Sequence, residues 1–399
     1  MFYLKVLGGN LKTASATKRE LAVAKALGYD VRVIEGVSGA NDFEYVYDGY
    51  EVSAVATQLV DKPTWIQRRL HWIGAKALFR LAFKAWQIRA DVISGYDLFC
   101  LLAVYIANIF KRHKAKLIYD SREFELYRYA PGRTEFQRKI IKLVEGFLIR
   151  RVDLALMVGD KIADEVQEIY HLKMCPTVVR NIPPYWHLEP EKSAEIRKQF
   201  LTALGFSKDG FLLMYHGGIM KGRGIECAIQ ALAFLPDDVG IVIMGDEPNQ
   251  GIVEKFRELA EEMGVGKRVL FRKAVSIQVL KDYIGAVDLE MVLIEGKTCR
   301  SYAYSLPNKF FESIQACVPM ICSDLLEMGK IVRQYDIGLL VNEDDDKSVA
   351  EAVLKLRSDK GLYDRLRSNM ARAREELCWE RESLKLKAAI RRVMGQDCT

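Results

Sequence analysis

The sequence lacks the features that would assign a protein to a class at first sight. Its eight cysteines are scattered, without a CxxC pair or a Cys/His spacing typical of a metal site, so we expect reduced thiols. No apolar run is long enough to cross a bilayer, and the first residues do not resemble a signal peptide. There is no GxGxxG, which argues against a dinucleotide-dependent oxidoreductase. These absences favour a cytoplasmic protein.

The length and the apolar runs predict an α/β protein of two domains. A chain of 399 residues is too long for one ordinary core. Short apolar runs alternate with longer mixed segments, which favours parallel sheets covered by helices. The expected strands are residues 4–7, 31–34, 92–94, 117–119 and 154–158 in the first half, and 211–215, 239–244, 269–271, 289–293, 320–322 and 338–341 in the second.

Three prolines within residues 183–190 indicate the boundary between the domains. We therefore expect an N-terminal, acceptor-binding domain over residues 1–185 and a C-terminal domain over 186–371. Residues 372–394 have the pattern of one long amphipathic helix, and we expect the segment 372–399 to pack back on the first domain. The two doubly wound domains would face each other across a cleft, because ligands of such sheets bind at the carboxyl ends of the strands.

A glycine-rich turn after the first strand of the second half predicts an anion site. Gly217 and Gly218 follow the strand, and Arg223 precedes the next helix. Backbone N–H groups at such a turn attract anions, and glycine lets a phosphate approach closely. The alternative is an ordinary turn with solvated basic residues. His216 precedes the glycines, and such a histidine more often braces its own loop than takes part in catalysis.

The first half has candidate cleft residues at equivalent positions. Gly8 and Gly9 form the corresponding loop, where they would face the same ligand, although a βα turn often needs glycine anyway. Arg122 and Glu123 follow another predicted strand. Either a structural ion pair or a ligand contact explains them.

The most informative stretch is residues 302–312. Asn308 follows a proline and opens a predicted helix, and Lys309 and Glu312 share one face of its first turns. A cation and a carboxylate there suit a ligand with an anionic part and a hydroxyl-rich part. A nucleotide sugar has both, in its diphosphate and its ribose. The alternative is a solvated Lys–Glu pair at a helix start.

Together these motifs resemble those of retaining GT-B glycosyltransferases of family 4. The matching order is a strand, Gly-Gly, Arg-Gly and a helix, then a strand that ends at Gly245, then Ser-Leu-Pro-Asn-Lys-x-x-Glu over residues 305–312. In the first half, residues 119–123 resemble the family's Asp-Ser-His-Glu segment. The resemblance covers nearly the whole chain and is more specific in the second half. It implies the GT-B fold, two Rossmann-like domains, and a nucleotide-sugar donor.

The resemblance also implies roles for single residues. Glu312 matches the second Glu of the family's E-x7-E motif, which implies that its carboxylate binds the ribose hydroxyls. Arg223 falls at the family's Lys, which implies a contact to the donor diphosphate, and Gly217 and Gly218 match the loop beneath that diphosphate. Lys309 belongs to the Pro-Asn-Lys variant of the motif, which implies a contact to a phosphate or to the sugar.

Some positions depart from the family's pattern. Tyr304 stands where the first Glu of E-x7-E is expected, Gly218 replaces the usual Arg, and Arg122 stands where many relatives have His. These departures fall at positions where the family contacts the donor sugar. Gly245 and Asn308 complete the implied donor-binding set.

The chemistry that the family implies needs no dedicated base, no metal and no cofactor besides the donor substrate. The leaving diphosphate helps to deprotonate the acceptor on the same face of the sugar, and catalysis rests on stabilising the diphosphate charge. Arg223, Lys309 and Glu312 would be the catalytic residues. We expect the acidic run 344–346 to be a solvated turn and helix cap rather than a metal site.

The implied acceptor is a glycan or a lipid-linked acceptor of cell-surface polysaccharide synthesis. Two alternatives stay open at this point. A nucleotide-sugar epimerase of the same fold would need further acid–base carboxylates. A degenerate, non-catalytic module that binds a nucleotide sugar would fit Tyr304 and Gly218. We do not expect nucleic-acid binding, because no recognised motif for it occurs.

Residues 62–89 form a second unusual segment, in which Trp and Phe recur at helical spacing among Lys and Arg. Such a basic amphipathic helix suits an anionic membrane surface. The hypothesis is that it brings a peripheral enzyme to the inner face of the membrane, where a lipid-linked acceptor would lie. The alternative is a core-facing stripe with a solvated basic face.

Overall fold

The computed structural model of the protein describes residues 1–396 except 40, 58–69, 131 and 249. The chain divides into two compact units, Met1–Arg180 with Glu382–Thr399 and Asn181–Arg381. We call them the first unit and the second unit. The second unit therefore begins at residue 181 and ends at residue 381, whereas the sequence predicted a domain that begins at 186 and ends at 371. The expected cleft between the two domains stays a prediction.

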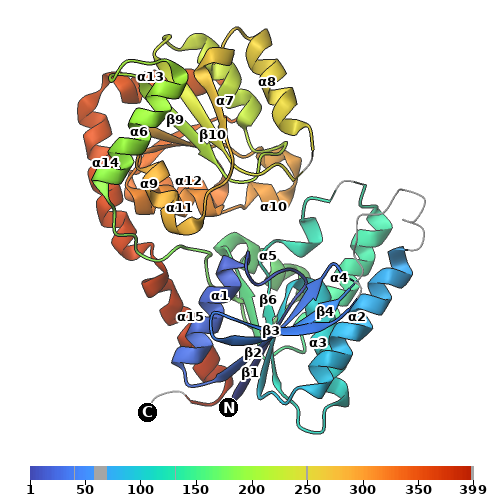
Figure 1. The fold of residues 1–399 in the computed structure, drawn as a ribbon. Helices are drawn as coiled ribbons and strands as arrows, with labels where there is room; N and C mark the ends of the chain where they lie inside the picture. Colours follow the sequence, from blue (N-terminus) through green and yellow to red (C-terminus); the bar gives the residue numbers. More distant parts are fainter. Residues whose placement is uncertain (40, 58–69, 131, 249, 397–399) are drawn as a thin grey trace. The chain divides into compact units, whose positions relative to one another are not determined.

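The first unit is built on an eight-stranded sheet of order β3-β4-β2-β1-β5-β6-β7-β8 (Figure 1). Its central strands are mostly apolar and buried, as expected for strands covered on both faces, although β1 contains Lys5 and β2 contains Arg32 and Glu35. Its strands are β1 Phe2–Leu7, β2 Asp30–Val37, β3 Phe43–Tyr47, β4 Tyr50–Ala56, β5 Val92–Tyr96, β6 Lys116–Asp120, β7 Leu154–Met157 and β8 Thr177–Val178.

The β3–β4 hairpin corrects the expectation of a purely parallel sheet, because β3 pairs antiparallel with β4 while the other neighbours are parallel. Asp48 and Gly49 connect the two strands with φ of 55° and 76°. Two consecutive positive φ values give the twist of a tight hairpin turn. The hairpin forms one edge of the sheet.

Helices cover both sides of this sheet. Figure 1 shows α1 and α15 on one side and α2 and α3 on the other. A capping box at Thr134 and Gln137 starts α4, because each side chain satisfies a backbone N–H of the other residue. The helices of the first unit are α1 Ser15–Ala26, α2 Leu70–Gln87, α3 Asp97–Phe110, η2 Glu125–Tyr127, α4 Glu135–Ile149, α5 Asp160–Tyr170 and most of α15 Trp379–Val393.

The second unit is built on a six-stranded, parallel sheet of order β11-β10-β9-β12-β13-β14. The strands predicted at 239–244 and 338–341 have these same bounds in the structure. The strands are β9 Phe211–His216, β10 Val239–Met244, β11 Val269–Arg272, β12 Leu289–Val292, β13 Met320–Ser323 and β14 Gly338–Val341.

The helices of the second unit fill the connections between these strands. They are α6 Pro190–Leu204, α7 Ile225–Ala231, η3 Leu232–Phe234, α8 Ile252–Glu262, η4 Gly266–Arg268, α9 Ile277–Ile284, η5 Gly296–Thr298, α10 Arg300–Ala303, α11 Asn308–Ala316, α12 Leu326–Tyr335, α13 Asp346–Ser358 and α14 Lys360–Glu376. The expectation of one helix over 372–394 is wrong, because α14 ends at Glu376 and α15 begins at Trp379.

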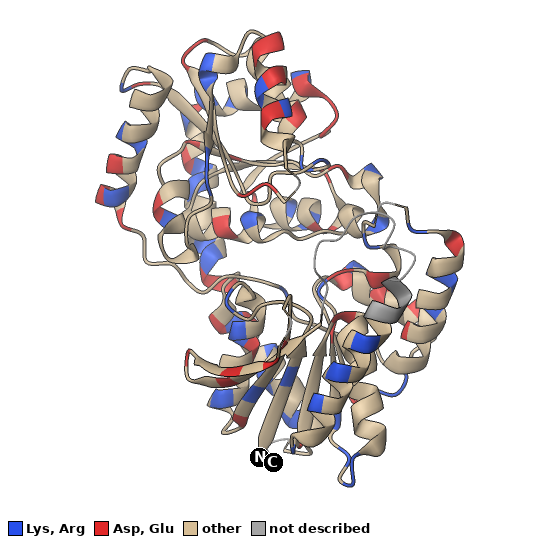
Figure 2. Cartoon of the chain, turned by 45° about the vertical axis from the view of Figure 1, so that its right-hand side comes forward, with Lys and Arg blue, Asp and Glu red and all other residues tan. Residues whose placement is uncertain are grey.

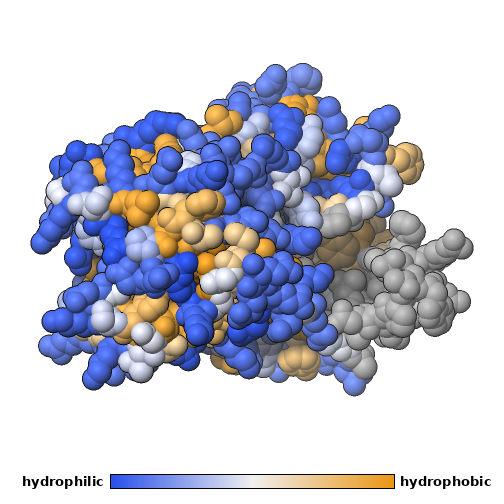
Figure 3. Space-filling view, turned by 90° about the horizontal axis from the view of Figure 1, so that it is seen from above, coloured by the Kyte–Doolittle hydropathy of each residue, from blue (hydrophilic) through white to orange (hydrophobic). Residues whose placement is uncertain are grey.

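Apolar side chains from the strands and helices form the core of the second unit, with Ile241, Ile243 and Leu289 among the fully buried ones. Figure 3 shows a surface that is mostly hydrophilic, with separate orange patches of apolar residues. Of the helices that the structure describes, none has both the length and the hydropathy of a transmembrane segment.

Candidate functional site

Two glycine turns pack backbone to backbone at the carboxyl ends of β9 and β10. Gly217 has φ of +119°, a conformation that favours glycine. A Cβ atom on Gly245 would lie 1.8 Å from the Gly217 carbonyl oxygen, so no side chain fits there. The Gly217 N–H donates to the Met244 carbonyl at 3.0 Å. Both glycines therefore fix the loop, while Gly218 has open space beside it, with Pro248 4.0 Å away.

Lys309 lies directly beneath this loop. A Cβ atom on Gly217 would be 3.6 Å from Lys309 Cε and 3.9 Å from its Nζ. The ammonium group lies 3.4 Å from the centroid of the Tyr215 ring. The residue is 6% exposed, and its Nζ has no hydrogen-bond partner among the described residues. A buried cation without a partner is costly, which indicates a ligand site.

Arg223 brings a second positive charge to the same place. Its guanidinium carbon lies 4.7 Å from the centroid of the Tyr302 ring, which holds the side chain in position. Burial first, and then the charge of Arg223, lower the pKa of Lys309 well below its usual range, although Glu290 and Glu312 oppose this. Arg223 contributes to the lowered pKa of Lys309 because it is a second positive charge. Their repulsion would be relieved by a bound anion.

His216 joins two carboxylates under the same loop. Its Nδ1 lies 3.0 Å from Glu290 Oε1, and its Nε2 lies 2.9 Å from Glu312 Oε2. Burial lowers the pKa of His216, but the two carboxylates outweigh it and raise the pKa to about 9. Burial also raises the pKa of Glu290, and His216 works against that shift. His216 is therefore a cation that fixes Glu312.

The predicted donor-site residues of the second unit lie in the loops after β9 and β10 and on α11. Lys309 and Glu312 are both buried, which contradicts the alternative of a solvated pair. Asn308 is the first residue of α11, and its Oδ1 accepts from Asn181 Nδ2 at 2.6 Å. Tyr304 is buried at the end of α10. The contact of Glu312 with ribose stays a prediction.

In the first unit, Gly8 and Gly9 line a cavity of about 330 Å³ together with Tyr96, Asp97 and Phe99, among other residues. Neither glycine has a positive φ. The glycines therefore leave room beside the carboxyl end of β1 rather than providing a special backbone conformation. The role of this cavity in acceptor binding stays a prediction.

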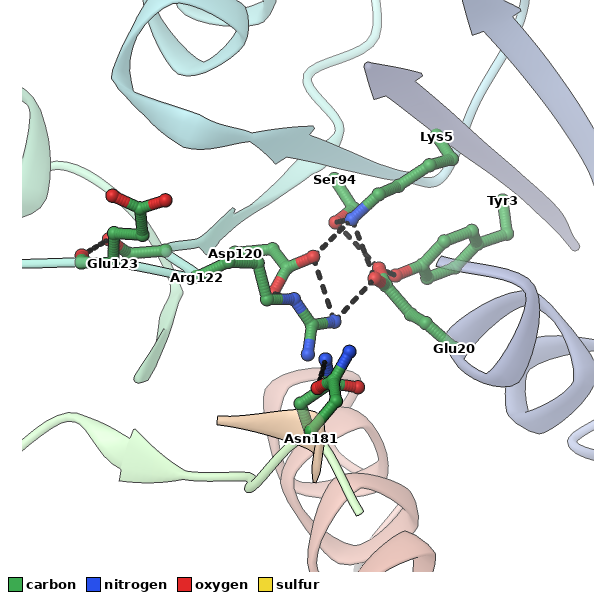
Figure 4. A network of polar contacts seen from close by, with 10 residues as sticks. Tyr3, Lys5, Glu20, Ser94, Asp120, Arg122, Glu123 and Asn181 are labelled. Atoms are coloured by element: carbon green, nitrogen blue, oxygen red, sulfur yellow. Dashed lines mark hydrogen bonds and ion pairs between the residues drawn. The ribbon is translucent and has the colours of Figure 1, made fainter. Parts of the chain in front are cut away.

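Arg122 belongs to a buried network of charges in the first unit (Figure 4). Lys5 Nζ lies 2.6 Å from both Glu20 Oε2 and Asp120 Oδ2, and it donates to Ser94 Oγ at 3.1 Å. Arg122 Nε lies 2.7 Å from Asp120 Oδ1. Burial raises the pKa of Asp120, but Arg122 and Lys5 outweigh it and lower the pKa to about 2. Two cations thus face two carboxylates. Arg122 forms its ion pairs with Asp120 and Glu20, and not with Glu123 as one of the two alternatives predicted.

Glu123 does not take part in that network. Its carboxylate lies 3.1 Å from Arg128 Nε, on the surface. The predicted acidic run at 344–346 includes Asp345, whose side chain caps α13 by accepting from the Ser348 N–H, so the cap is confirmed. Within the part of the chain that the structure describes, no group of three His, Cys, Asp or Glu side chains has the arrangement of a metal site.

Sequence reasoning missed Glu290, Lys5 and Glu20. A signal was present for two of them, because Lys5 and Glu290 are charged residues inside the apolar runs of β1 and β12. A charge on a strand buried on both faces needs a partner. Their partners are distant in sequence and become visible only in the fold.

Comparisons with known proteins support this description. Residues 210–359 match the model of the family Glycosyl transferases group 1. The D-inositol 3-phosphate glycosyltransferase of Streptomyces bingchenggensis is 24% identical over 247 residues, which are 59% of this chain and 52% of that protein. The chain spans about half the length of the curated relatives that it matches.

Solved structures match over the whole chain. Sucrose-phosphate synthase from Thermosynechococcus elongatus has a TM-score of 0.77 at 16% identity, over 99% of this chain and 100% of that one. HepE of Anabaena, in complex with UDP and glucose, has a TM-score of 0.74 at 15% identity, over 99% and 100% of the two chains. The chain therefore has the α/β GT-B fold, as predicted. The similarity to glycosyl transferases group 1 covers residues 210–359, and it falls on the unit that carries Lys309, Arg223 and Glu312.

Proposed function

We propose that the protein is a retaining, family 4 glycosyltransferase that moves a sugar from a nucleotide-sugar donor to a glycan or lipid-linked acceptor in cell-surface polysaccharide synthesis. One observation carries the proposal: the buried amino group of Lys309 has no hydrogen-bond partner among the described residues, beneath the Gly217 loop and under the influence of a second cation at Arg223. A diphosphate is the part of the donor that fits two converging cations and a glycine turn.

In the proposed reaction, the bond between the anomeric carbon and the diphosphate oxygen breaks, and the acceptor oxygen forms a bond to that carbon on the same face. The acceptor proton passes to the departing diphosphate, so no separate base is needed. Lys309 and Arg223 stabilise the charge that grows on the diphosphate, and they are fixed before the reaction begins. Glu312, oriented by His216, accepts hydrogen bonds from the ribose hydroxyls.

UDP is the first nucleotide to test, because HepE, which shares the fold, was solved with UDP. A thermal-shift screen with UDP, GDP, ADP and their sugar conjugates identifies the donor. A ligand present at about one hundred times its Kd stabilises the native state by roughly 2.7 kcal/mol. We expect one nucleotide diphosphate to raise the Tm of the protein, and the same compound to have no effect on Lys309→Met.

Donor turnover separates the proposed enzyme from the other candidates. Slow hydrolysis of the stabilising nucleotide sugar, with the configuration of the released sugar retained, supports transfer. Epimerisation of that sugar, or binding without any turnover in the presence of glycan and lipid-linked acceptors, contradicts it. Activity that survives EDTA supports the proposed independence from metal ions, and its loss contradicts that part alone.

A further inference from the structure

Three neighbouring helices of the first unit carry an apolar outer surface. On α4, the side chains of Phe136, Ile140, Leu143 and Phe147 are exposed, and their spacing places them on one stripe. Phe136 and Leu143 are 71% and 74% exposed. The buried residues of α4 are Glu145, Gly146, Leu148 and Ile149, near its C-terminal end, and none of them belongs to the stripe.

The apolar surface continues from α4 to α3. The ring of Tyr105 on α3 lies 5.7 Å from the ring of Phe147, edge to face. Ile109 and Phe110, at the end of α3, are exposed as well. After Asp97, α3 contains no charged residue. A helix this apolar is normally covered on both sides, yet here its last turn faces solvent.

From α3 the surface reaches α2, where Phe79, Phe83 and Trp86 are exposed and again spaced along one stripe. The Trp86 indole donates to the Phe110 carbonyl at 3.1 Å, and the rings of Phe83 and Trp86 are 5.7 Å apart. We call the exposed apolar residues of α2, α3 and α4 the three-helix face. Aromatic residues dominate it, which a soluble surface rarely shows over several elements.

Positive charge surrounds the three-helix face. Residues 135–151 contain five basic residues and two acidic ones, and Glu145 is buried. Lys139 and Lys142 are exposed next to the stripe of α4, and Arg151 stacks on Phe147 at 3.7 Å. Figure 2 shows Lys and Arg, in blue, recurring along α2 as well, where Arg80 and Lys84 form ion pairs with Asp42 and Glu44. An apolar, aromatic centre with a basic border is complementary to a bilayer that carries negative charge.

We propose that the three-helix face docks on an anionic lipid bilayer, with its aromatic side chains inserted at the interface. The site extends the membrane hypothesis for residues 62–89 to α3 and α4, which the sequence did not indicate. Residues 62–69 lie outside the described residues, and the proposal does not depend on them. It also does not depend on the proposed transfer reaction, because it rests on the surface of the first unit alone.

Vesicle flotation of the full chain tests the proposal. We expect the protein to float with vesicles of equal parts phosphatidylcholine and phosphatidylglycerol at low salt, and to stay in solution with phosphatidylcholine alone. Lys139→Glu with Lys142→Glu should lower the partition coefficient roughly ten- to a hundredfold. Phe136→Ser with Leu143→Ser should lower it at least as much, because the inserted apolar area is lost.

Matched controls lie on the second unit. Leu326 is 62% exposed, and Leu326→Ser should leave flotation unchanged, as should Lys255→Glu with Lys267→Glu. Absence of flotation at low salt overturns the proposal, and so do face variants that float like the native protein. A native dimer that Phe136→Ser with Leu143→Ser converts to a monomer also overturns it, because the face would then bind a second copy. Donor hydrolysis in solution should be equal in all variants, which separates this test from that of the transfer reaction.

Discussion

The ammonium group of Lys309 lies 3.4 Å from the centroid of the Tyr215 ring, and it has no hydrogen-bond partner within the residues that the structure describes. The ring offers its negative face to the cation. Burial and Arg223 nevertheless lower the pKa of Lys309 well below its usual range. The free protein therefore disfavours the charged form of Lys309, and a bound anion would favour it.

Lys309→Met should have opposite effects on stability and on function. Removing the buried amine should raise the free energy of unfolding by about 1–2 kcal/mol, because the desolvation cost disappears. It should also abolish the Tm increase caused by the nucleotide diphosphate. Urea unfolding and thermal shift measure the two effects. Lys267→Met, at an exposed position, should change neither. A variant that is destabilised and still binds the nucleotide would contradict the assigned role.

Arg223→Ala should lower kcat/KM by roughly a hundredfold, corresponding to about 3 kcal/mol of lost transition-state stabilisation. Arg257→Ala is a matched control. Arg257 lies on α8, and its guanidinium carbon is 4.6 Å from the centroid of the Phe271 ring, so it also stacks on an aromatic side chain. We expect native activity in the control. Equal loss in both variants would mean that stacking, not diphosphate binding, explains the effect.

Both Glu312→Gln and Glu312→Ala should strongly lower the rate of sugar transfer, while the protein keeps its fold. Gln retains the size of the side chain but not its charge, so the bond to His216 weakens and the ribose loses an ionic acceptor. Initial rates with the identified donor measure the effect, and Glu262→Gln, on the surface of α8, serves as control. Near-native rates in both Glu312 variants would remove Glu312 from the site.

The stability of the second unit should fall at alkaline pH because of His216. Its pKa is raised from 6.5 to about 9, so the stabilisation is complete below the lower value and is lost as the pH rises through the higher one. Between pH 7 and pH 10 the native protein should lose roughly 2 kcal/mol more than His216→Gln does. His187→Gln, at an exposed histidine, should follow the native profile. Parallel profiles for native protein and His216→Gln would show that the histidine is not charged in the fold.

Lys5→Met should destabilise the first unit by about 3–5 kcal/mol, because Glu20 and Asp120 lose one of the two cations that balance them. Adding Glu20→Gln should recover a large part of this loss, since the charges are balanced again. Unfolding of the single and double variants in urea measures the coupling. Strictly additive losses would mean that Lys5 contributes by packing rather than by charge.

The sequence predicted the strands well where a parallel strand is buried on both faces. The runs 239–244 and 338–341 are apolar from end to end, and glycine or a charged residue follows them closely. The β3–β4 hairpin was missed although Asp48-Gly49 is a common hairpin turn, because the edge strand β3 is mostly exposed and has no apolar run. The break at residues 377–378 was missed because neither proline nor glycine marks it.

The candidate site was predicted in part. Two short motifs contain Gly217, Arg223, Lys309 and Glu312, so the spacing within each motif was enough to predict them as site residues. The bond from His216 to Glu290 was not predictable, because 74 residues separate the two in sequence and pairing between strands joins them. The same holds for Lys5 and Asp120, which are 115 residues apart. Which charged residues neutralise one another depends on which strands are neighbours in the folded sheet, and the order of residues in the sequence does not show this.

The first unit is discontinuous, since Glu382–Thr399 belongs with Met1–Arg180, whereas the second unit is one uninterrupted segment. During synthesis on the ribosome, the later segment 181–381 can therefore complete its structure before the earlier one can. The usual order, in which the N-terminal domain matures first, is reversed for this chain. Until residues 382–399 emerge, the first unit lacks one of its segments, and the surface that this segment covers stays exposed. We expect the nascent chain to need chaperones most during that interval.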